Sequence, residues 1–206
     1  FLTSKVAEIV QGYDQTMKAV EGSLKRLQTD YLDLLLIHWP VREHFFDTWR
    51  ALEQLKADGQ VKSIGVSNYT IAHLELLATK AKEMPVVNQV EYHPYLNQQA
   101  LADYDQEHDI VTEAWSPLGR RVVLDDPMLA KMAAHHNKSV AQVILRWELQ
   151  HQLVTIPKST HPERIQENAN IFDFSLDIDE MTMIDLLNTV SYTHLRAHET
   201  RSTLVC

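Results

Sequence analysis

The sequence of 206 residues is 45% hydrophobic, which fits one sizeable folded core and excludes a disordered or fibrous chain. Its formal net charge of −9 argues against a general nucleic-acid or anionic-membrane surface, because both partners require a positive field. The single cysteine, Cys206, excludes a disulfide within the chain and fits a reducing compartment.

Neither a membrane span nor a signal peptide can be recognised in the sequence. No apolar run approaches the roughly 20 residues needed to cross a bilayer. Residues 1–6 lack the charged-then-apolar layout of a signal peptide. We therefore expect a cytoplasmic protein with neither a membrane nor a nucleic acid as partner.

Short apolar runs alternate with longer amphipathic runs along the chain. The short runs have the length and the branched or aromatic content of strands buried on both faces, and they cover residues 1–6, 33–39, 61–67, 86–93, 110–116 and 153–157. The amphipathic runs predict helices within residues 16–30, 46–59, 70–82, 101–108, 127–137, 139–150, 162–172 and 178–189. Gly59 is a typical C-terminal cap of the second helix.

Alternation of strands and helices predicts an α/β fold with parallel strands and right-handed crossovers. Two architectures remain open, a doubly wound sheet and a (β/α)8 TIM barrel. No strand is followed by a G-x-G-x-x-G or Walker-type loop, which disfavours the common nucleotide-binding open sheets. Polar residues instead follow the strands, as on the active-site rim of a barrel, namely Lys5, His38, Asn68, Gln89 with Tyr92 and His93, Ser116, and Lys158.

The predicted strand–helix units are six, whereas a closed barrel of this type needs eight. We therefore expect strands 3 to 8 of such a barrel, with two units missing upstream. Open strand edges would favour self-association of such a fragment.

Each rim residue also has an ordinary explanation when it is taken alone. His38 could be a buried histidine bonded to a carbonyl, and Lys5 could be a surface lysine that buries only its stem. The functional interpretation depends on the barrel, in which these residues face one rim.

The run "VTIPKSTHPERIQEN" predicts an anion site at a helix start. Thr160 and Glu163 have the spacing of a capping box, and Pro162 lies in the first helical turn. Lys158 and Arg164 add two cations near the exposed N–H groups of that turn, as a phosphate ligand would require.

Five segments resemble the aldo-keto reductase family, in order and at the family's spacing: "DYLDLLLIHWP", "IGVSNY", "VNQVEYHPY", "AWSPLG" and "IPKSTHPERIQEN". The resemblance runs from Phe1 to about Thr189. The subgroup that is most similar is the bacterial reductases of 2,5-diketo-D-gluconate and of small dicarbonyls such as methylglyoxal. The resemblance implies a (β/α)8 barrel that uses NADPH, without a Rossmann domain, to reduce aldehydes and ketones to alcohols.

The resemblance also implies roles for individual residues at the substrate. Lys5 resembles the lysine that lowers the pKa of a catalytic tyrosine, and His38 the histidine that orients the substrate carbonyl. Trp39 is implied at the substrate. A tyrosine with a pKa near 10 is a weak acid at neutral pH, and a nearby ammonium would lower that pKa and make the hydroxyl a better proton donor. A neutral His38 that donates a hydrogen bond would polarise the carbonyl.

The implied NADPH contacts extend over several strand ends. The nicotinamide carboxamide would be held by Ser67, Asn68 and Gln89, and Trp115 would stack on the nicotinamide ring. The pyrophosphate would lie along Ser116, Leu118 and Gly119. The 2′-phosphate would be clamped by Lys158, Ser159 and Arg164, with Glu167 and Asn168 near the adenine.

The sequence departs from the family pattern at its beginning. The family's catalytic tyrosine and its aspartate lie upstream of the lysine strand, and Phe1 has no residue before it here. We therefore expect low reductase activity from this polypeptide, acting on a small carbonyl substrate, in a family whose members are usually monomeric. The alternative is an NADPH-binding, redox-sensing subunit of the same fold that is not catalytic.

Residues 191–206 differ from the rest of the chain. They shift to Ser, Thr, His and Arg without an apolar period, so we expect a barrel domain at 1–190 and a disordered or non-native tail. His194 and His198 are four residues apart, with Glu199 and Cys206 as further possible ligands. We expect no metal site there, because these ligands do not form a recognised metal-binding pattern.

Overall fold

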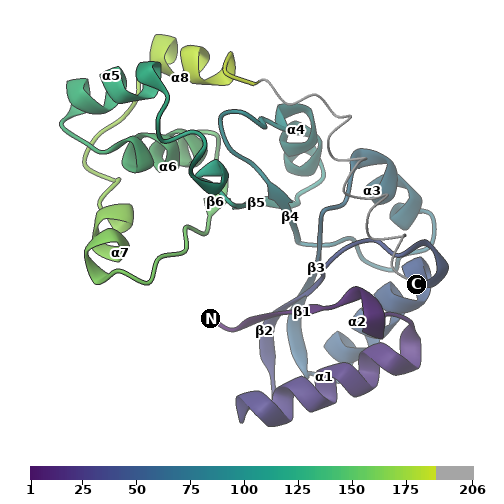
Figure 1. Cartoon of the computed structure of the whole chain (residues 1–206). Coiled ribbons are helices and arrows are strands. Elements are labelled where there is room, and N and C mark those ends of the chain that lie inside the picture. Colours follow the sequence, from purple (N-terminus) through teal and green to yellow (C-terminus); the bar gives the residue numbers. More distant parts are fainter. Residues whose placement is uncertain (189–206) are drawn as a thin grey trace. The chain divides into compact units, whose positions relative to one another are not determined.

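The structure is a computed structural model that describes residues 1–188 of the chain (Figure 1). Within these residues the strands are β1 (Thr3–Val6), β2 (Leu32–Ile37), β3 (Val61–Ser67), β4 (Val87–Glu91), β5 (Val111–Trp115) and β6 (Val154–Thr155). The helices are α1 (Tyr13–Leu27), α2 (Phe45–Ala57), α3 (Ile71–Ala78), α4 (Gln99–Glu107), α5 (Pro127–His136), α6 (Val140–Gln150), α7 (Pro162–Ala169) and α8 (Ile178–Asp185). Three short 3-10 helices are η1 (Glu8–Val10), η2 (Arg42–His44) and η3 (Gly119–Arg121).

The strands follow one another in chain order in a six-stranded sheet, β1-β2-β3-β4-β5-β6. The pairs β1–β2, β2–β3 and β3–β4 are parallel, with Lys5 beside Leu36 and Ser67 beside Gln89. This confirms the predicted alternation, since each parallel pair needs a crossover and a helix supplies it. None of the helices in residues 1–188 is long and apolar enough to span a bilayer.

The chain divides into two compact units. Among the described residues, the first contains Phe1–Val90 and Ala100–Glu113, and the second contains Glu91–Gln99 and residues 114–188. The prediction of one barrel domain at 1–190 stays a prediction. The prediction for the tail and its pair of histidines lies outside the described residues.

The core of the first unit forms where β2 and β3 are covered by helices. Leu35 and Ile37 of β2 are almost completely buried, as are Trp49 and Leu52 of α2. Burial on this scale contributes about 1.5–3 kcal/mol for each large apolar side chain. Helix α2 ends where the sequence predicts, because Gly59 adopts a left-handed φ of 76° after its last turn.

The core of the second unit is centred on Trp147 in α6. Its ring is fully buried beside the ring of Tyr92, with 5.4 Å between centroids. Its Nε1–H donates to Asp185 of α8 over 2.8 Å, and the Tyr92 hydroxyl donates to Asn97 over 2.8 Å. Tyr92 therefore has a packing role in this unit.

Candidate functional site

A chain of polar side chains crosses three strands of the first unit. Lys5 of β1 donates a hydrogen bond from Nζ to Oε1 of Gln89 in β4. Gln89 in turn donates from Nε2 to Oε1 of Glu113 in β5. The glutamine therefore has its oxygen toward a cation and its nitrogen toward an anion, which is the orientation that the charges favour.

The environment of Lys5 lowers its pKa. Partial burial of the ammonium is the larger influence, and the carboxylate of Glu113 opposes it. A lysine in this setting is easier to deprotonate than one in water. The role of Lys5 in lowering the pKa of a tyrosine needs the charged ammonium, which burial disfavours and Glu113 favours, and this role stays a prediction.

His38 lies immediately after β2, and its backbone N–H donates to the carbonyl of Val6 over 3.1 Å. Its Nδ1 is 3.3 and 3.4 Å from the two carboxylate oxygens of Glu8 in η1. The side chain is 42% exposed, which excludes a buried core histidine. The ring of Trp39 lies edge-on to that of His38, with 6.4 Å between centroids.

Asn68 connects the histidine to the residues predicted to hold the nicotinamide. Its Nδ2 donates to the carbonyl of His38 over 2.9 Å and to Oγ of Ser67 over 3.1 Å. The backbone N–H of Asn68 and the hydroxyl of Ser67 both donate to the carbonyl of Gln89, over 2.9 and 2.8 Å. Asn68 has a φ of 62°, a left-handed conformation that asparagine tolerates better than most residues. The structure thus brings Lys5, His38, Ser67, Asn68 and Gln89 together.

In the second unit, β5 ends in a tight turn that begins at Trp115. Ser116 has a φ of 51°, and its carbonyl accepts from the N–H of Gly119 over 2.8 Å. Gly119 also has a φ of 51°, and an added Cβ would lie 3.1 Å from Val123 Cγ1 and 3.3 Å from the His93 ring. The turn that contains Leu118 therefore requires glycine after it.

The predicted anion site at the start of α7 differs in one detail from the sequence-based prediction. The N-cap is His161, and Pro162 is the first helical residue, so the capping box of Thr160 and Glu163 is wrong. Proline favours the first helical position, which moves the cap one residue beyond Thr160. Within residues 1–188, no side chain caps this helix start.

The residues around this helix start remain compatible with an anion. Lys158 and Arg164 are exposed, and neither forms an ion pair within the described part of the chain. The Ser159 hydroxyl accepts from the N–H of His161 over 3.1 Å. Glu167 and Asn168 lie half-buried near the end of α7.

Two acidic residues of the first unit were missed by sequence reasoning. Glu113 carried a signal, because an acidic side chain inside a strand buried on both faces requires a partner. The sequence gives no such signal for Glu8, because η1 is a single short turn without a recognisable sequence pattern.

Comparison with known proteins relates the chain to one family. The model of the aldo/keto reductase family matches residues 1–189. The chain is 56% identical over 188 residues to a glyoxal reductase of Bacillus subtilis. This alignment covers 91% of this chain and 68% of that relative. It is 43% identical over 192 residues to the methylglyoxal reductase DkgA of Yersinia pestis, covering 91% of this chain and 69% of the relative.

Solved structures give the same result. A crystal structure of a mutant of Gox0644 in complex with NADPH matches with a TM-score of 0.88 and 46% identity, covering 91% of this chain and 70% of that one. The sheet order and this match confirm the predicted fold class, since such reductases are (β/α)8 barrels. The chain therefore belongs to the aldo/keto reductase family of oxidoreductases.

Proposed function

We propose that this protein is an NADPH-dependent carbonyl reductase for small dicarbonyls or keto sugars, such as methylglyoxal or 2,5-diketo-D-gluconate. The observation that carries this proposal is the hydrogen bond from Asn68 Nδ2 to the carbonyl of His38. It joins the residue proposed to hold the nicotinamide carboxamide to the residue proposed to orient the carbonyl. The names of the glyoxal and methylglyoxal reductases that this chain resembles support the choice of substrate.

When bound, NADPH supplies the hydride that adds to the carbonyl carbon. The oxygen must then receive a proton, and Lys5 would tune the hydroxyl that provides it. Ser67, Asn68 and Gln89 would hold the carboxamide, Trp115 would stack on the nicotinamide ring, and Ser116, Leu118 and Gly119 would follow the pyrophosphate. Lys158, Ser159 and Arg164 would clamp the 2′-phosphate, with Glu167 and Asn168 at the adenine and Trp39 at the substrate.

The contact of His38 with Glu8 restricts how the histidine can act. When a neutral ring donates from Nδ1 to Glu8, its Nε2 has no proton and can only accept a hydrogen bond. A ring that donates from Nε2 to a carbonyl must either be doubly protonated or turn an unprotonated Nδ1 toward the carboxylate. Glu8 therefore acts on the tautomer of His38.

We also propose that a polypeptide of residues 1–206 has little reductase activity by itself. The family resemblance requires a tyrosine and an aspartate upstream of Lys5. Tyrosines of the first unit have other surroundings, since the guanidinium of Arg50 lies 4.8 Å from the ring centroid of Tyr13. The hydroxyl of Tyr69 is buried without a hydrogen-bond partner in residues 1–188. Burial raises its pKa, which makes it a poor acid.

The experiment that tests cofactor binding does not depend on turnover. NADPH is titrated into the full chain, and binding is followed by nicotinamide fluorescence. Arg164→Ala should weaken NADPH binding about 10- to 100-fold, because a hydrogen bond to a charged group contributes about 1.5–3 kcal/mol. NADH, which lacks the 2′-phosphate, should bind equally to both proteins.

The matched control is Arg26→Ala, which removes an exposed arginine of α1 that donates to Ser23 Oγ over 3.0 Å. This control should leave the NADPH affinity unchanged. Unchanged affinity in Arg164→Ala would refute the clamp. Absence of NADPH binding by the unmodified chain would refute the proposed cofactor.

A further inference from the structure

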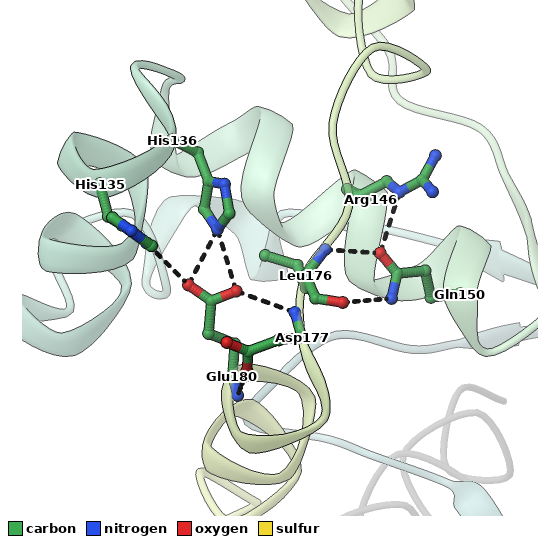
Figure 2. Close-up of polar contacts among 7 residues, drawn as sticks. All are labelled: His135, His136, Arg146, Gln150, Leu176, Asp177 and Glu180. Atoms are coloured by element: carbon green, nitrogen blue, oxygen red, sulfur yellow. Dashed lines mark hydrogen bonds and ion pairs between the residues drawn. The ribbon is translucent and has the colours of Figure 1, made fainter.

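Two imidazoles and one carboxylate converge where the end of α5 meets the start of α8 in the second unit (Figure 2). Nε2 of His136 is 2.8 and 2.9 Å from the two carboxylate oxygens of Glu180. Nδ1 of His135 is 3.3 Å from one of the same oxygens. One ligand atom from each of the three residues lies within 4.8 Å of the others. From this geometry we propose a binding site for a divalent zinc ion formed by His135, His136 and Glu180.

The donor atoms suit zinc in type and in spacing. Two imidazole nitrogens and one carboxylate form a three-ligand set that zinc accepts, with water at the fourth position. Tetrahedral zinc with bonds of about 2.0–2.2 Å holds its ligand atoms about 3.3–3.6 Å apart. The contact of His135 with Glu180 already has this separation, and that of His136 has to open by about half an ångström. The two imidazole nitrogens lie within 4.8 Å of each other, so rotation of the exposed His135 has to bring them to the same separation.

The carboxylate is held in place before any ion arrives. Oε2 of Glu180 accepts from the backbone N–H of Asp177 over 3.0 Å, and Oδ1 of Asp177 accepts from the N–H of Glu180 over 2.8 Å. This reciprocal capping box fixes the Glu180 side chain at the first turn of α8, where Figure 2 shows it directed toward both histidines. Ordered ligands favour metal binding because less conformational entropy is lost.

The two histidine side chains differ in exposure and therefore in how easily they rotate. The His136 side chain is 16% exposed, and its ring packs 5.3 Å from that of Phe174. The His135 side chain is 73% exposed, so it can rotate to complete the coordination and leaves solvent access to a fourth ligand. Zinc bound here would connect α5 to α8 and would stabilise the second unit by mass action. None of these three residues has a role in the proposed reductase site.

Isothermal titration of zinc into the chelator-treated full chain tests this site. We expect one site that also binds cobalt with the visible absorption of tetrahedral coordination, and no binding of magnesium, which prefers oxygen ligands. His136→Ala and Glu180→Gln should each weaken zinc binding at least about 10-fold, since loss even of an outer-shell partner has that effect. Glu180→Gln preserves the capping box, because glutamine serves equally at that position.

Two controls separate this site from other histidines. His108→Ala removes an exposed histidine directly after α4 that stacks on Tyr104, and it should leave zinc affinity unchanged. The double variant His194→Ala, His198→Ala should also retain the site. Zinc affinity that is lost in the double variant, or that is equal in Glu180→Gln and the unmodified chain, would overturn the proposal.

Discussion

Asp105 should make the stability of the first unit depend on pH in a direction opposite to that of most acidic residues. It lies fully buried in α4, where its Oδ2 accepts from Thr112 Oγ1 over 3.0 Å and from Asn88 Nδ2 over 3.2 Å. Burial raises its pKa from 3.8 to about 7, against the two hydrogen bonds, which lower it. Between these values the folded chain retains a proton that the unfolded chain has lost. The free energy of unfolding therefore falls as the pH rises from about 4 to 7.

The size of this effect follows from the two pKa values. Their difference corresponds to at most about 4 kcal/mol, and we expect about 2–4 kcal/mol. Asp105→Asn mimics the protonated acid, because its amide oxygen can still accept from Thr112. At pH 5 the variant should already be more stable than the unmodified chain by about 1–2 kcal/mol, and at pH 8 it should be more stable by the full amount.

Urea unfolding followed by circular dichroism at pH 5 and pH 8 measures this difference. Asp109→Asn is the matched control, because Asp109 is exposed and its φ of 58° suits asparagine equally well. A pH dependence in Asp105→Asn equal to that of the unmodified chain would refute the reasoning.

Two further predictions concern packing and the candidate site. Gly65→Ala should destabilise the protein by about 1–3 kcal/mol in thermal unfolding, because the added Cβ would lie 2.6 Å from the Val87 carbonyl oxygen. Gly22→Ala, inside α1 and with only the end of Arg26 at 3.3 Å, should instead stabilise it by about 0.5–1 kcal/mol, and equal effects would contradict this packing. In nitrogen-15 NMR of the histidines, neutral His38 should carry its proton on Nδ1, where the Glu8 carboxylate accepts it. Glu8→Ala removes that acceptor and should move the proton toward Nε2, so an unchanged tautomer in this variant would exclude Glu8 as the cause.

Much of the fold could be predicted because each strand carries its own apolar run. The third strand was predicted at its observed bounds, Val61–Ser67, and the other five differ at the ends. The last is shortest, Val154–Thr155 against a predicted 153–157, and the predicted run ended on Pro157, which has no N–H for a sheet. The helix start at His161 was misplaced because the capping-box spacing and the proline gave conflicting signals.

The candidate site was predictable as a set of residues but not as a set of contacts. Lys5 and Gln89 lie within two strands, and His38 and Asn68 follow two others. The parallel arrangement alone predicts that they meet. Which side chains bind one another depends on strand register and rotamer. The sequence does not reveal that Gln89 lies between Lys5 and Glu113, residues separated by more than a hundred positions.

The position of Gln89 couples two proposed roles that the family resemblance treats separately. Its Oε1 accepts a hydrogen bond from the Lys5 ammonium, and its Nε2 donates one to the Glu113 carboxylate. A ligand carboxamide that binds the side chain of Gln89 must therefore compete with one of these charge-assisted bonds. If it takes Oε1, Lys5 loses an acceptor that stabilises its charged form. If it takes Nε2, Glu113 loses a donor and becomes more available to Lys5. Binding at Gln89 and ionisation of Lys5 are in both cases thermodynamically linked, so Lys5 and Gln89 have to be understood as one unit of the site.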